Sequence, residues 1–114
     1  MRLIIDGGSG LIGRALAKSL IANDHEVLMI SRDPEAVHNL QPGVKAVDWG
    51  RKTLAGHMQD ADAIVNLAGA SVAGENLLKM RWTEKRKKQI LESWVNSGMI
   101  ISEVIWPINK KPEV

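Results

Sequence analysis

Four glycines stand close together near the start of the chain, in the stretch GGSGLIG at residues 7–13. Their spacing satisfies two patterns at once, Gly8-x-Gly10-x-x-Gly13 and Gly7-x-x-Gly10-x-x-Gly13. Where a strand turns into a helix, glycines let the backbone approach a pyrophosphate, and the helix start supplies unpaired amides and a partial positive charge. The spacing therefore predicts a phosphate cradle that needs no charged side chain. The alternative is a tight turn without a ligand.

The residues after the second apolar run decide which dinucleotide suits such a cradle. An acid there accepts the ribose 2′-hydroxyl of NAD, whereas an arginine accommodates the 2′-phosphate of NADP. Here Ser31, Arg32 and Asp33 follow the run, and Pro34 comes next. Ser31 can donate to a phosphate, while Asp33 before a proline is typical of a helix cap. The sequence favours NADP over NAD, with Arg32 as the selecting residue.

Short apolar runs that alternate with helical patterns must position these residues. We expect strands over residues 3–5, 25–32, 44–49 and 61–70, each a short apolar run bounded by turn residues. We expect helices from residue 11 to about residue 23, over 33–40, over 53–59, and over 83–105 with Thr83 as the cap. This alternation predicts an α/β fold, a truncated Rossmann fold whose parallel sheet has strand order 3-2-1-4 and helices on both faces.

Length and composition limit the class of protein. The 114 residues, 45% hydrophobic and 25% charged, predict one globular domain over 1–114. The absence of cysteine excludes disulfides, zinc-thiolate sites and thiol nucleophiles, and agrees with a cytoplasmic location. No apolar run approaches the ~20 residues that span a bilayer, so we expect no membrane partner.

A basic cluster occupies residues 79–88, KMRWTEKRKK, in which Trp82 could stack on a base. Glu84 lies inside the cluster, and the formal net charge of the chain is only +2. We therefore interpret the cluster as the solvated start of a helix and expect no nucleic-acid partner.

Histidines and paired acids give no metal site. His25, His38 and His57 have no second ligand at metal-binding spacing, so we expect no metal. Asp60 and Asp62 are interpreted as a solvated turn before a strand.

The motifs GGSGLIG, SRDP, VDW, NLAGAS, RWTE and ILES, in this order across most of the chain, resemble the extended short-chain dehydrogenase/reductase superfamily. More narrowly, they resemble its nucleoside-diphosphate-sugar epimerase family. The resemblance implies backbone contacts to the cofactor from the glycine stretch, 2′-phosphate contacts after the second strand, and nicotinamide-side contacts after the fourth. The implied cofactor-binding residues are Gly7, Gly8, Ser9, Gly10, Leu11, Ile12, Gly13, Ser31, Arg32, Leu67, Ala68 and Gly69.

The chain departs from that family in ways that bear on catalysis. Family members are much longer, and they use a Tyr-x-x-x-Lys pair and a serine after the fifth strand, whereas this chain has no tyrosine. We expect no catalytic residue in it and no family reaction from the isolated chain. Asp6 stands where the superfamily usually has threonine, and its carboxylate would repel a pyrophosphate unless protonated or otherwise bonded. Trp94 stands where the family often has an arginine near the cofactor.

Three functions remain open at this point. The chain is an NADP-favoured dinucleotide-binding domain of an epimerase or reductase, or a nucleotide-responsive or oligomerising module without turnover, or a decayed gene product that binds no cofactor. Without a fifth strand, the strand at 61–70 would leave an apolar sheet edge open to pairing. We therefore expect a homo-oligomer formed through that edge or through the C-terminal helix.

Overall fold

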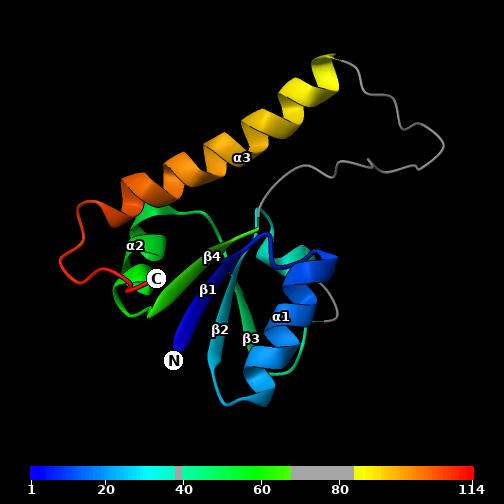
Figure 1. The fold of residues 1–114 in the computed structure, drawn as a ribbon. Helices are drawn as coiled ribbons and strands as arrows, with labels where there is room; N and C mark the ends of the chain where they lie inside the picture. The colour runs from blue at the N-terminus through cyan, green and yellow to red at the C-terminus, as the bar shows by residue number, and fades with distance from the viewer. Residues whose placement is uncertain (38–39, 68–83) are drawn as a thin grey trace.

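Four parallel strands form the central sheet (Figure 1). The computed structural model describes residues 1–37, 40–67 and 84–114. The strands are β1 (Arg2–Asp6), β2 (Glu26–Ile30), β3 (Val44–Val47) and β4 (Ala63–Asn66), in the order β3-β2-β1-β4. This order and the parallel pairing confirm the predicted Rossmann-like architecture, with β1 at the centre of the sheet.

Helices cover both faces of the sheet (Figure 1). Helix α1 (Leu11–Ala22) lies on one face, and α2 (Arg51–Gln59) and α3 (Glu84–Ile105) lie on the other. Because successive side chains of a strand point to opposite faces, β1 contributes to two cores. Ile5 packs with Ala17 of α1, whereas Ile4 packs in the core that holds α2 and α3. No helix in the described ranges is long and apolar enough to cross a membrane.

The connection between β2 and β3 differs from the helix expected over 33–40. Its described part holds a single 3-10 turn at Pro34–Ala36, and residues 38–39 lie outside the described residues. Pro42 disfavours the helical conformation of the residue before it, and Gly43 then takes a φ of 95° to lead into β3. The described helical structure has already ended at Ala36, before these two residues.

The chain's last residues lie beside β4. The amide of Ile64 donates to the carbonyl of Val114 at 2.9 Å, and the amides of Glu113 and Val114 donate to the carbonyl of Asp62 at 3.0 and 3.4 Å. This is the bonding pattern of neighbouring parallel strands. The sheet edge that we expected to be open is therefore covered at its start by the C-terminal tail.

Candidate functional site

The glycine stretch forms the turn between β1 and α1. Gly7 has a φ of 73°, a conformation that side-chain-bearing residues rarely adopt, so the turn needs glycine there. The amide of Gly10 donates to the carbonyl of Gly7 at 3.3 Å, and the amide of Arg14 donates to the carbonyl of Gly10 at 3.0 Å. The turn thus passes directly into the first helical turn of α1.

Packing within the protein requires a glycine at Gly13 and leaves little room for a side chain at Gly8. A Cβ on Gly13 would lie 2.4 Å from the Cα of Gly8, a distance that real Cβ atoms essentially never show. A Cβ on Gly8 would lie 2.7 Å from the Cγ of Met29 in β2. These two glycines let α1 begin close against the turn and the turn lie close against the sheet.

Gly10 differs, because no packing among the described residues requires a glycine at this position. Of the described atoms, a Cβ there would meet the carbonyl oxygen of Gly7, at an ordinary 3.6 Å, and the φ of −75° suits any residue. Gly10 is the N-cap of α1 but has no side chain to bond the free amides of the first turn. Leu11 and Ile12, which follow it, are 88% and 70% exposed. A helix start left open in this way fits a phosphate group.

Arg14 belongs to this site, although the sequence motif did not single it out. Its Nε donates to the carbonyl of Ser9 at 2.8 Å, which ties the first turn of α1 back to the glycine turn. The guanidinium also places a permanent positive charge beside the helix start. Arg14 directly follows Gly13, the last glycine of the motif, and this position could have indicated from the sequence that it belongs to the site.

The strand register brings the other predicted residues to the same edge of the sheet. Asp6 of β1 lies opposite Ile30 of β2 and Asn66 of β4, so the segments that follow these strands leave the sheet side by side. The amide of Leu67 donates to the carbonyl of Asp6 at 2.8 Å. Ala68 and Gly69 lie outside the described residues. Strand order reverses at β1, which is where ligands bind in open α/β sheets.

The two residues predicted to hold a 2′-phosphate follow β2. The hydroxyl oxygen of Ser31 accepts a hydrogen bond from the amide of Asp33 at 3.2 Å, and its hydrogen stays available to donate. Arg32 is exposed. Both residues therefore lie at the carboxyl edge of the sheet, beside the strand that leads into the glycine turn.

Asp6 is buried at the end of β1, with 3% of its surface exposed. Its Oδ2 atom has no hydrogen-bond partner among the described residues. Desolvation by burial raises the pKa of this carboxyl from 3.8 to about 6, against the opposing effect of a hydrogen bond from the backbone of Gly7. A buried carboxyl with a raised pKa thus adjoins the glycine turn.

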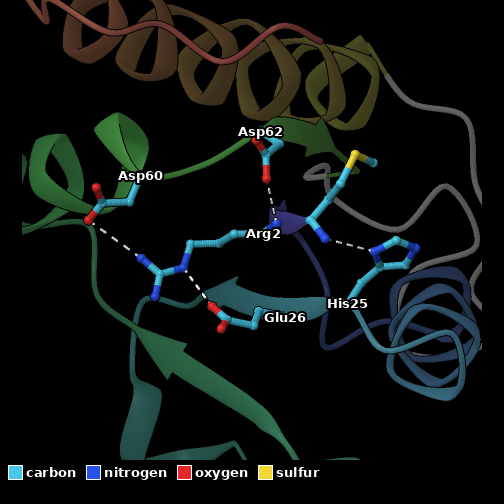
Figure 2. Close-up of polar contacts among 6 residues, drawn as sticks. Arg2, His25, Glu26, Asp60 and Asp62 are labelled. Atoms are coloured by element: carbon cyan, nitrogen blue, oxygen red, sulfur yellow. Dashed lines mark hydrogen bonds and ion pairs between the residues drawn. The ribbon is translucent and has the colours of Figure 1, made fainter.

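A second polar cluster lies at the opposite, amino-terminal end of the strands (Figure 2). Arg2 is paired through Nε with Glu26 at 2.9 Å and through a terminal nitrogen with Asp60 at 3.5 Å. The backbone amide of Arg2 donates to Asp62 at 2.8 Å, and the terminal amine of Met1 lies 3.0 Å from Nδ1 of His25. Asp60 and Asp62 therefore anchor the start of β1. The described ranges hold no group of three potential metal ligands.

The basic cluster of residues 79–88 lies partly within α3. Residues 79–83 lie outside the described residues. Lys87 is paired with Glu84 at 3.1 Å, and Lys88 is paired with Glu92 at 3.8 Å. Acidic neighbours on the same helix thus accompany the basic side chains.

Comparison with known proteins identifies the family. Residues 3–87 match the family model described as NAD dependent epimerase/dehydratase family. The chain belongs to this family. An epimerase family protein of Staphylococcus saprophyticus is 31% identical over 111 residues, which cover 97% of this family member and 35% of the relative. The human epimerase family protein SDR39U1 is 32% identical over 115 residues, covering 99% and 34% respectively.

A solved structure agrees with the fold of this epimerase-family chain. The crystal structure of human SDR39U1 (isoform 2) with NADPH superposes with a TM-score of 0.75 at 34% identity, covering 99% of this chain and 34% of the human one. This epimerase-family chain therefore spans about a third of the length of the relatives that it matches.

Proposed function

We propose that this epimerase-family chain is a single domain that binds a nicotinamide dinucleotide, and that it prefers NADPH to NADH. The observation that carries the proposal is the open start of α1 at Gly10, where packing among the described residues would tolerate a side chain. The human relative whose structure contains NADPH supports the choice of ligand.

Each part of the site has a role in this proposal. The backbone amides of Leu11, Ile12 and Gly13, in the first turn of α1, bind the pyrophosphate together with that of Ser9, and the positive end of the α1 dipole stabilises its charge. Gly10 leaves room for the phosphate, since its own amide donates to Gly7. Ser31 and Arg32 bind the 2′-phosphate. Leu67, Ala68 and Gly69 contact the nicotinamide side.

The chain supplies binding and orientation rather than chemistry. A bound nicotinamide supplies or accepts a hydride. The sequence contains no tyrosine to move the accompanying proton in the manner of the family's Tyr-x-x-x-Lys pair. We therefore propose that the chain binds the dinucleotide without turning over a substrate by itself.

Calorimetric titration with NADPH and NADH tests the proposal. We expect micromolar binding, with NADPH tighter by at least about tenfold because a guanidinium pairs strongly with a phosphate. The blocking variant is Gly10→Val, whose added side chain fills the open helix start and should abolish binding while the fold is kept. The matched control is Gly56→Ala, since a Cβ at that exposed position meets nothing within 4 Å. Failure of both dinucleotides to bind the unaltered chain would overturn the proposal.

We also infer that the chain associates with a second copy through α3. The described part of this helix exposes four large apolar side chains, those of Leu91, Trp94, Val95 and Met99. The N-terminal half of the helix extends past the sheet (Figure 1). The C-terminal tail already bonds to the start of the β4 edge, whereas the apolar side chains of α3 are exposed.

The order of side chains along α3 favours an antiparallel copy as the occupant. Lys87, Leu91, Val95, Met99 and Glu103 follow one another at four-residue intervals and form one oblique row on the helix. When two such rows pack about a two-fold axis at Val95, Leu91 lies opposite Met99 and Lys87 lies opposite Glu103. The apolar part of the row is therefore complementary to itself. Its charged ends are already paired within one chain, Lys87 with Glu84 at 3.1 Å and Glu103 with Arg51 at 2.7 Å.

A further inference from the structure

Asp6 is an ionisable residue buried at the end of β1, where no described charged side chain offsets its charge. Its side chain shares a face of β1 with Ile4, which packs in the core under α2 and α3. One carboxyl oxygen, Oδ2, is buried without a hydrogen-bond partner among the described residues. Burying an ionised carboxylate without a partner is strongly unfavourable, so the site favours the neutral acid.

The elements packed around this end of β1 bring uncharged groups to Asp6. Its neighbours in register are Ile30 of β2 and Asn66 of β4. From α3 comes Ser97, whose hydroxyl lies 3.4 Å from both side-chain atoms of the Asn66 amide. The backbone amide of Gly7 is the one group that favours the ionised form, and no described charged side chain contributes to the raised pKa.

Asp6 also directly precedes the glycine turn in which the proposed dinucleotide would place its pyrophosphate. The backbone carbonyl of Asp6 accepts a hydrogen bond from the amide of Leu67, so Asp6 connects the glycine turn to the segment after β4. A pyrophosphate carries two negative charges, and like charges in a poorly solvated site strongly disfavour each other. Protonation of Asp6 would remove both the cost of burying its charge and its repulsion of the pyrophosphate.

We propose, resting on the proposed function, that Asp6 binds one proton when a dinucleotide enters the glycine turn, so that cofactor affinity is controlled by pH through this residue. The threonine that the superfamily usually has at this position carries no such charge. Dinucleotide binding by this chain would therefore be stronger in mildly acidic solution than at neutral pH. Above the pKa that the Asp6 carboxyl has in the chain without dinucleotide, each pH unit would weaken binding by up to about tenfold, because the fraction of protonated Asp6 falls tenfold per unit.

The test uses NADH, because its pyrophosphate stays ionised throughout, whereas the 2′-phosphate of NADPH itself titrates near pH 6. Calorimetric titrations between pH 5.5 and pH 8 give the affinity, and repeating them at pH 7.5 in two buffers of different ionisation enthalpy counts the protons taken up. We expect the affinity of the unaltered chain to fall about tenfold between roughly pH 6.5 and 7.5, with uptake of close to one proton.

The matched variant is Asp6→Asn, which keeps the shape of the side chain and removes its charge. We expect its affinity for NADH to be nearly independent of pH and its proton uptake to be absent. Asp6→Thr serves in its place if circular dichroism shows that Asp6→Asn does not fold. Equal pH slopes in the unaltered and substituted chains would overturn the role of Asp6 and leave the proposed function standing. Failure of NADH and NADPH to bind at every pH would overturn both.

Discussion

Gly13 in α1 lies against Gly8 in the preceding turn, so closely that a Cβ on Gly13 would come within 2.4 Å of the Cα of Gly8 and within 2.6 Å of its carbonyl oxygen. The contact is between backbone atoms, which cannot rotate away as the end of a side chain can. The start of α1 and the glycine turn are therefore one packed unit. Its shape is set by the protein itself before a ligand arrives, which reduces the ordering that binding would require.

This contact predicts that Gly13→Ala destabilises the fold. The added methyl group forces the backbone apart, an overpacking effect of about 1–3 kcal/mol. Gly56→Ala in α2 makes the same chemical change where nothing lies within 4 Å, and it should stabilise the chain by about 0.5–1 kcal/mol because alanine favours a helix. Urea unfolding followed by circular dichroism measures both. Equal effects of the two substitutions would contradict the packing described for Gly13.

Asp6 predicts a pH dependence of stability. Its pKa is 3.8 in the unfolded reference and about 6 in the folded chain, so the unfolded chain releases this proton first as pH rises. The folded state therefore loses stability between about pH 4 and 6, by up to about 3 kcal/mol above that window. Asp6→Asn should be more stable than the unaltered chain at pH 7.5 and similar to it at pH 4. Urea unfolding at both pH values checks this, and an equal difference at both would contradict it.

Arg32 predicts the preference between the two dinucleotides. Replacing it with alanine removes a charge-assisted bond to the 2′-phosphate, so NADPH affinity should fall about 10- to 100-fold while NADH affinity changes little. Lys110→Ala removes the same charge from the exposed C-terminal tail, which lies beside β4 and not beside β2, and should leave the ratio of the two affinities unchanged. If the Arg32 variant kept a full preference for NADPH, another residue would be the selector.

The exposed apolar side chains of α3 predict that the chain forms a dimer in solution. Sedimentation equilibrium should give a dimer, and Val95→Glu should give a monomer because it buries two like charges beside the two-fold axis. Asn96→Glu places the same charge at the next, exposed position of the helix and should leave the dimer intact. A monomeric unaltered chain at micromolar concentration would exclude association through α3.

The strands and the long helices were predictable from the sequence because local patterns determine them. The apolar run before Gly7 is a buried strand, the run around Ile64 is a half-buried strand, and the apolar spacing after Leu11 is an amphipathic helix. The region after Asp33 was less predictable. Asp33 and Pro34 signal the start of a helix but do not determine its length, because a cap acts on the first turn alone. The described helical structure there is one 3-10 turn, Pro34–Ala36.

The site was predictable only where backbone geometry defines it. The glycine spacing identified the turn between β1 and α1, and alternation along β1 now places Asp6 on the core face. Other features depend on contacts between distant segments. The bond from Arg14 to Ser9, the depth at which Asp6 is buried and the bonding of Val114 to Ile64 all arise from tertiary packing, which no local pattern encodes.

The central place of β1 has a consequence for synthesis on the ribosome. Residues 2–6 leave the ribosome before the other strands, yet one side of this strand pairs with residues 26–30 and the other with residues 63–66. A nascent chain that has emerged only as far as α2 can join β1, β2 and β3, while the second side of β1 still exposes its backbone groups. The strand β1 therefore gains its second neighbour late, because its pairing with β4 can form only after residues 63–66 have left the ribosome.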